Sequence, residues 1–193
     1  MKTFKILGII VSALLVVVLV VVFMQPAKGH VEKSIIINAP ASAIFPHVNN
    51  MKNFTVWSPW SKMDPAAKQT FEGAEAGIGA KMSWVGEKTG KGSQWVEASV
   101  ENESVKTGLT FEGIEGTAWA EFKLISEGNG TKVTWTYDGD NAGFKGKAIW
   151  LMMGSMLGSQ YEDGLKDLKQ LVENTSVGEP KQEMSPVDST ATK

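Results

Sequence analysis

The sequence predicts an α+β domain, in which a curved antiparallel sheet lies against one long C-terminal helix, preceded by a single transmembrane helix. Three observations lead to this prediction: an uncharged apolar run from Ile6 to Met24, alternation of apolar and polar residues between Thr70 and Asp138, and helical spacing of apolar residues from Phe144 onward. A single antiparallel sheet cannot bury its own apolar face, and the last helix is the only predicted element large enough to cover it.

The run from Ile6 to Met24 is long and apolar enough to cross a membrane. A bilayer core needs about 20 helical residues, and fifteen of these nineteen are Ile, Leu, Val or Phe. Together they contribute about −5 to −9 kcal/mol toward insertion. Because Lys2 and Lys5 precede the run, the positive-inside rule predicts that residues 1–5 are cytoplasmic. The domain is then extracytoplasmic, on the periplasmic side of the cell (inner) membrane.

Two other interpretations of this run are less favoured. A cleaved signal peptide has a shorter apolar stretch and a cleavage site with small residues, whereas the segment from Phe23 to Lys28 offers no convincing site. A helix that is apolar on all sides can also be buried, but this requires a large protein around it. The absence of cysteine excludes a lipid-modified N-terminal cysteine.

The remaining chain divides into three parts. Residues 25–30 form a linker, residues 31–174 form one domain, and residues 175–193 form a polar tail that is expected to be disordered. A net charge of −2 gives no indication of a nucleic-acid partner. All nineteen basic residues are lysines, which disfavours a bidentate clamp for an anionic group. Without cysteine there is no thiol catalysis, thiolate metal site or disulfide.

The domain begins with a β-branched strand from Val31 to Asn38, ended by Ala39-Pro40. A short helix follows over Ala41–Val48, since proline is tolerated in the first helical turn. A second helical turn or a loop then leads to Trp57-Ser58-Pro59-Trp60.

Six strands should follow in an antiparallel meander. The apolar alternation places them at Thr70–Glu72, Ala80–Val85, Gln94–Val100, Val105–Glu112, Thr117–Ile125 and Thr131–Asp138. The last two are joined by Glu127-Gly128-Asn129-Gly130, a strong hairpin signal.

The C-terminal helix of roughly 30 residues has one apolar face. That face comprises Trp150, Met153, Leu157, Tyr161, Leu165, Leu168 and Val172. The helix also contains Met152, Met153 and Met156, with glycines at 154, 158 and 164. Glycine in a helix costs up to about 1 kcal/mol, so either another element approaches the backbone closely or space is left open. Contact of this helix with a membrane is a third interpretation.

This order of elements, with Trp57-Ser58-Pro59-Trp60 followed by Asp64-Pro65, resembles the helix-grip fold of the Bet v 1-like superfamily. The superfamily is also called START-like or SRPBCC, and it includes polyketide cyclases/dehydrases and lipid-transport proteins. The resemblance covers Val31 to about Asn174. It implies a hollow between the long helix and the sheet, where a hydrophobic small molecule binds.

Aromatic and apolar residues at inward positions are the candidate lining of such a cavity. They are Trp57, Trp60, Met82, Trp84, Trp95, Phe111, Phe122, Trp135, Tyr137, Trp150, Met153 and Leu157. Each of the tryptophans is also consistent with an ordinary core position. No catalytic residue, metal ligand or cofactor is predicted, because His30 and His47 have no partner at ligand spacing.

Three hypotheses for function follow. The favoured one is membrane-anchored binding or transport of a lipid-like or polyketide-like molecule. A cyclase/dehydrase-like enzyme would need a carboxylate turned inward beside His47 or Tyr137. A non-enzymatic envelope module would use the polar tail or a sheet edge to recruit a protein, whose identity the sequence does not indicate.

Overall fold

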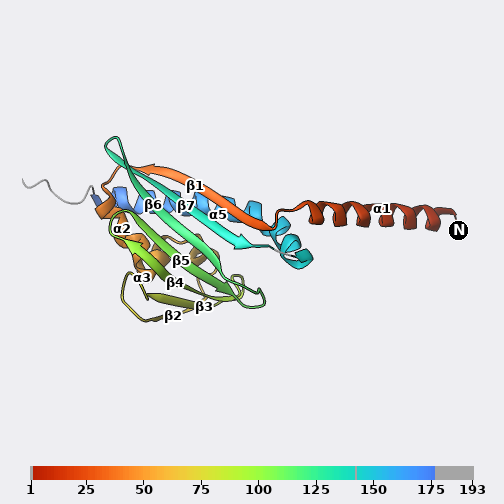
Figure 1. Cartoon of the computed structure of the whole chain (residues 1–193), viewed down its shortest axis with the longest axis horizontal. Helices are drawn as coiled ribbons and strands as arrows, with labels where there is room; N and C mark the ends of the chain where they lie inside the picture. The colour runs from red at the N-terminus through yellow and green to blue at the C-terminus, as the bar shows by residue number, and fades with distance from the viewer. Residues whose placement is uncertain (1, 142, 177–193) are drawn as a thin grey trace, which may run out of the picture.

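The computed structural model describes residues 2–141 and 143–176. The helices are α1 (Lys2–Met24), α2 (Ala41–Asn49), α3 (Met51–Trp57), α4 (Pro59–Met63) and α5 (Gly143–Ser176). The strands are β1 (Lys28–Ile37), β2 (Lys68–Glu72), β3 (Lys81–Val85), β4 (Lys91–Val100), β5 (Ser104–Phe111), β6 (Ala118–Glu127) and β7 (Gly130–Asp140). The predicted fold class is confirmed, since one curved antiparallel sheet lies against the long α5 (Figure 1).

The seven strands form one sheet in the order β1-β7-β6-β5-β4-β3-β2. β2 to β7 are consecutive neighbours, as a meander requires, and the first strand of the domain pairs with the last. A shift of register between Val96 and Ala98 interrupts the pairing of β4 with β5. Such an irregularity bends a strand and increases its twist, which helps the sheet to curve.

The core lies between the sheet and α5 and is rich in aromatic rings. Trp135 on β7 stacks on Phe122 of β6 at 4.7 Å and on Tyr161 of α5 at 3.8 Å between ring centroids. The apolar residues of α2 and α3 that are buried, among them Ile44 and Phe54, belong to the same cluster. The second half of α5 is thus fixed to the sheet by a continuous core.

Some boundaries differ from those predicted. β1 begins at Lys28 rather than Val31, because its pairing with β7 continues to Lys28 opposite Asp140. β4 begins at Lys91, three residues before the predicted Gln94, since Lys91 still pairs with Val85. Most of the predicted polar tail (residues 177–193) lies outside the described residues.

α1 leaves the domain at the end where α5 begins (Figure 1). The rings of Phe23 and Phe144 lie 5.7 Å apart, and the Lys147 ammonium donates a hydrogen bond to the Phe23 carbonyl at 2.8 Å. Within the described part of the chain, α1 is the one helix long and apolar enough to cross a bilayer. Its apolar side chains are exposed along nearly all of its length.

Candidate ligand cavity

A cavity of about 260 Å³ lies between the first half of α5 and the sheet. From α5 it is lined by Gly146, Ile149, Trp150, Met153, Met156, Leu157, Gln160 and Tyr161. From the strands it is lined by Gln69, Met82, Trp84, Gln94, Leu109, Phe111, Ala118, Tyr137 and Asp140. α3, α4 and their connections contribute Phe54, Ser58, Trp60, Ser61 and Met63, and the β5–β6 loop contributes residues 114–117. The walls are therefore mainly apolar, as in most small-molecule sites.

Glycines on the strands let two aromatic walls of the cavity lie close to the sheet. A Cβ on Gly29 of β1 would meet the Trp150 ring at 2.6 Å, and a Cβ on Gly92 of β4 would meet the Trp84 ring at 2.6 Å or less. Neither glycine can therefore gain a side chain unless a ring moves. The absence of a side chain at both positions fixes where the aromatic rings lie, and so the shape of the cavity.

Eight of the twelve residues predicted to line a cavity lie on its wall. They are Trp60, Met82, Trp84, Phe111, Tyr137, Trp150, Met153 and Leu157. They come from α4, three strands (β3, β5 and β7) and α5, so residues distant in the sequence converge as the helix-grip resemblance implies. Their contact with a ligand stays a prediction.

The other four predicted residues lie elsewhere. Trp57, Phe122 and Trp135 are fully buried in the aromatic core. Trp95 is on the opposite face of the sheet, where its indole N–H donates to Glu97 at 2.9 Å and its ring contacts Trp119. The alternation explains this placement, because Gln94 and Val96 are buried and the residue between them must point away.

The polar groups that line the cavity were not predicted, because nothing in their sequence context distinguishes them. Gln94 donates from its side-chain amide to the Thr107 hydroxyl at 3.0 Å, and Gln160 donates to the sulfur of Met63 at 3.7 Å. Asn141 is 8% exposed. Its buried Nδ2 has no hydrogen-bond partner among the described residues. An unpaired buried amide costs about 1–3 kcal/mol, so Asn141 is a candidate donor to a ligand.

The ionisable groups on the cavity wall are either neutral or at its edge. Burial raises the pKa of the Tyr137 phenol and raises that of Tyr161 well above its usual range. Both phenols are therefore uncharged at neutral pH. The charged lining residues Lys88, Glu115 and Asp140 are all exposed, and so lie at the cavity's mouth. Among the described residues, no charged side chain lines the interior of the cavity.

Neither histidine is part of this cavity. His47, whose pKa burial lowers, accepts a hydrogen bond from the Trp57 indole at its backbone carbonyl and does not line the cavity. His30 pairs with Asp138 at 2.8 Å on an exposed part of the β1–β7 ladder. The described residues contain no group of three or more His, Asp or Glu side chains arranged to hold a metal ion.

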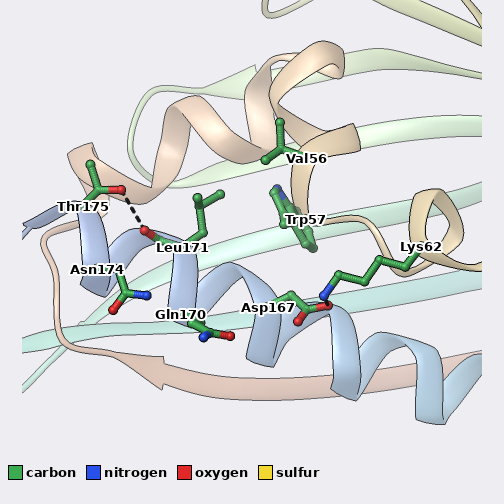
Figure 2. Close-up of a pocket in the computed structure, with 8 residues that line it drawn as sticks. All are labelled: Val56, Trp57, Lys62, Asp167, Gln170, Leu171, Asn174 and Thr175. Atoms are coloured by element: carbon green, nitrogen blue, oxygen red, sulfur yellow. Dashed lines mark hydrogen bonds and ion pairs between the residues drawn. The ribbon is translucent and has the colours of Figure 1, made fainter. Parts of the chain in front are cut away.

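A second depression is an open groove beside the other half of α5. Figure 2 shows it between α3, α4 and residues 167–175, with the Lys62 ammonium paired to Asp167 at 2.6 Å. Its volume is about 380 Å³, but it is less enclosed than the cavity and exposes far less apolar surface. Apolar ligands favour enclosed apolar sites, so the cavity is the better candidate.

Comparison with known proteins identifies the family. Residues 28–173 match the family model described as polyketide cyclase / dehydrase and lipid transport. The match includes every strand and the whole of α5 up to Glu173. A search of curated protein sequences finds no match.

Several solved structures are similar in fold. Protein SA2116, of unknown function, from Staphylococcus aureus has a TM-score of 0.60 with 14% identity, covering 80% of this chain and 99% of that protein. Aha1 from Colwellia psychrerythraea has a TM-score of 0.56 with 16% identity, covering 75% of this chain and 96% of that protein. DynU16, encoded in the dynemicin biosynthetic locus, has a TM-score of 0.56 with 12% identity, covering 76% of this chain and 48% of that protein. At these identities the likeness shows the fold alone.

Proposed function

Because the chain belongs to the polyketide cyclase / dehydrase and lipid transport family, we propose that it binds a hydrophobic small molecule between α5 and the sheet. The observation that carries the proposal is the apolar, partly enclosed cavity of about 260 Å³ at that place. Protein interiors normally pack with few voids larger than a water molecule. A space of this size therefore suggests that a guest is accommodated.

The walls favour an uncharged ligand that has at least one hydrogen-bond acceptor. A charged group would lose its hydration without gaining a partner, because the charged side chains lie at the mouth and not inside. A carbonyl or hydroxyl oxygen would suit the unpaired amide of Asn141. The cavity is slightly smaller than the roughly 300–1,000 Å³ of most small-molecule sites, which favours a compact molecule or one apolar chain.

We further propose that α1 stays in the membrane as an anchor and holds the domain at the extracytoplasmic surface. Its length and exposed apolar side chains suit a bilayer. Lys2 and Lys5 at its start favour a cytoplasmic N-terminus. The binding unit then begins at Lys28, where β1 starts, three residues before the predicted start at Val31, and the linker shortens to residues 25–27.

Binding is preferred here to cyclase/dehydrase-like catalysis. The predicted enzyme needs a carboxylate turned inward beside His47 or Tyr137, whereas the lining carboxylates Asp140 and Glu115 are exposed and His47 does not line the cavity. An envelope module that recruits a protein through the edge strand β2 would give no reason for an enclosed apolar cavity.

The test is to purify the full-length chain in mild detergent and examine it by native mass spectrometry and solvent extraction. We expect a hydrophobic compound at up to one molecule per chain, and saturable binding of the neutral dye Nile red to protein from which it has been removed. Ala118→Phe fills part of the cavity and should weaken dye binding at least about tenfold. Ala98→Phe is the matched control, because Ala98 is exposed on β4 and outside the cavity.

Wild-type protein that yields no hydrophobic compound and does not bind Nile red would overturn the proposal. Equal dye binding by the two alanine variants would also contradict it, since the dye would then be bound elsewhere.

A further inference from the structure

The first half of α5 and the β5–β6 loop expose apolar side chains that no other part of the described domain covers. Met152 is 80% exposed, and the others in this group are also exposed. We call this group the apolar rim: Ile114, Phe144, Leu151, Met152, Met153 and Met156. Scattered exposed apolar residues are ordinary, but a contiguous patch marks an interaction surface.

The sequence of this half of the helix shows the same feature independently. From Ala148 to Tyr161 there are fourteen residues without a charge, whereas Glu162 to Glu173 includes six charged side chains. A helix that lies between a protein and water normally has one polar, charged face. The segment from Ala148 to Tyr161 has no such face, so water is not its expected surrounding.

The apolar rim is continuous with α1. Phe144 contacts Phe23, and Lys147 donates to the Phe23 carbonyl. The Lys145 ammonium donates to the Gly113 carbonyl at 2.9 Å, which ties the loop with Ile114 to the start of α5. Three residues, 25–27, separate α1 from β1, and they span at most about 10 Å.

The mouth of the cavity opens at the same place. Ile114, Met153 and Met156 belong both to the apolar rim and to the cavity lining. A molecule leaving the cavity between these side chains would meet whatever covers the rim.

We propose that the lipid bilayer covers the apolar rim, so that the ligand passes between cavity and membrane without crossing water. This inference rests on the proposed function and on α1 as an anchor. A bilayer fits better than a protein partner, because the short linker places the rim at the membrane surface. Lys145 and Lys147 lie beside it at the start of α5, where phospholipid phosphates would lie.

The absence of cysteine makes a direct test simple. Full-length Met152→Cys is labelled with bimane and reconstituted in phosphatidylcholine vesicles that contain a nitroxide-labelled lipid. The control is Ile125→Cys, because Ile125 is 58% exposed and pairs with Lys132 next to the β6–β7 hairpin. This hairpin lies at the end of the sheet away from α1 (Figure 1). We expect the lipid nitroxide to quench the label at 152 at least about threefold more than the label at 125, and aqueous iodide to show the opposite order.

The exchange of ligand is tested with Leu151→Glu/Met152→Glu, two rim residues outside the cavity lining. We expect Nile red to move from vesicles into this variant at least about tenfold more slowly than into wild type, with equal dye affinity in detergent. Ile125→Glu should behave like wild type.

The outcomes separate this inference from the proposed function. If Nile red binds but the label at 152 is quenched like that at 125, the membrane contact is wrong and ligand binding stands. If the label at 152 contacts lipid but no dye or native compound binds, ligand binding and exchange both fail. Equal transfer rates for the rim variant and wild type would overturn the exchange route.

Discussion

The two halves of α5 belong to one continuous helix but meet the sheet in different ways. In the second half, Tyr161, Leu165, Leu168 and Val172 are completely buried, and lysines and carboxylates occupy the outer face. In the first half the residues toward the sheet line a cavity, and the outer face has no charge between Ala148 and Tyr161. Side-chain volume and charge, and not helix geometry, therefore decide where α5 packs directly on the sheet and where a cavity remains between them.

We call the second half of α5, which packs directly on the sheet, the closed half, and the first half, which lies over the cavity, the open half. The closed half is held by close contacts with the aromatic core. Tyr161 stacks on Trp135, and the Gly164 backbone lies against the same ring and against Pro59. The open half has flexible methionines where the closed half has leucines, and methionine adapts to guests of varied shape. Stability should therefore depend on the second half and ligand exchange on the first.

Truncating a leucine in each half of α5 should give the largest difference between the two halves in lost free energy of unfolding. Leu168 is 0% exposed, whereas Leu151 is 40% exposed. We expect Leu168→Ala to lower the free energy of unfolding by about 2–5 kcal/mol and Leu151→Ala by less than about 0.5 kcal/mol. Urea denaturation of the full-length protein in detergent, followed by tryptophan fluorescence, measures both values. Similar losses would mean that the two halves are equally packed.

Replacing a glycine of α5 by alanine should change the free energy of unfolding in opposite directions in the two halves of the helix. A Cβ at position 164 would lie 3.0 Å from both Pro59 and Trp135, whereas the nearest atom to a Cβ at position 158 is Lys33 Cε at 3.7 Å. We expect Gly164→Ala to destabilise the fold by about 1–3 kcal/mol and Gly158→Ala to stabilise it by up to about 1 kcal/mol. The same denaturation experiment decides between them. A stabilising Gly164→Ala would show that the closed half has space for a Cβ at position 164.

A smaller, pH-dependent effect on the free energy of unfolding should come from Asp64. This residue holds the Lys88–Thr89 turn, which forms part of the cavity wall. Its carboxylate accepts hydrogen bonds from the backbone N–H groups of Thr89 and Lys88 and from the Thr89 hydroxyl. The Thr89 backbone bond, then that of Lys88, lowers the Asp64 pKa below its ordinary 3.8. Because the folded-state pKa is the lower one, the stabilisation is complete above that ordinary value and is lost as the pH falls through the folded-state pKa.

The measurement compares wild type with Asp64→Asn in urea at about pH 6 and at about pH 3. We expect the difference in stability between the two proteins to shrink at the lower pH. A difference that does not change with pH would show that the carboxylate's charge has no part in holding the Lys88–Thr89 turn.

Much of the fold was predictable from the sequence because it depends on periodicity. Alternation located six strands, β-branched residues indicated the first one, and helical spacing identified the buried positions of α5 from Tyr161 to Val172. The strand ends were less predictable, since Lys28 and Lys91 are held by pairing with a distant or neighbouring strand rather than by their own side chains.

The candidate site was only partly predictable, for two physical reasons. The aromatic character of Trp95 predicts an inward position, but its neighbours Gln94 and Val96 occupy the inner face of β4. Trp57, Phe122 and Trp135 are predicted to line the cavity but lie in the aromatic core, because whether an apolar ring faces a void or other rings depends on packing in three dimensions. Asn141 follows the last strand with no pattern to mark it, and only the folded chain shows that its Nδ2 has no hydrogen-bond partner among the described residues.

The most direct test of a ligand cavity under the first half of α5 is nuclear magnetic resonance on full-length protein with ¹³C-methyl methionine. The chain has nine methionines, of which Met63, Met82, Met153 and Met156 line the cavity. With the native compound or Nile red bound, intermolecular Overhauser effects should connect the ligand to Met82 and Met153. A bound ligand with no such contact to any of these four methyl groups would contradict a cavity between the helix and the sheet.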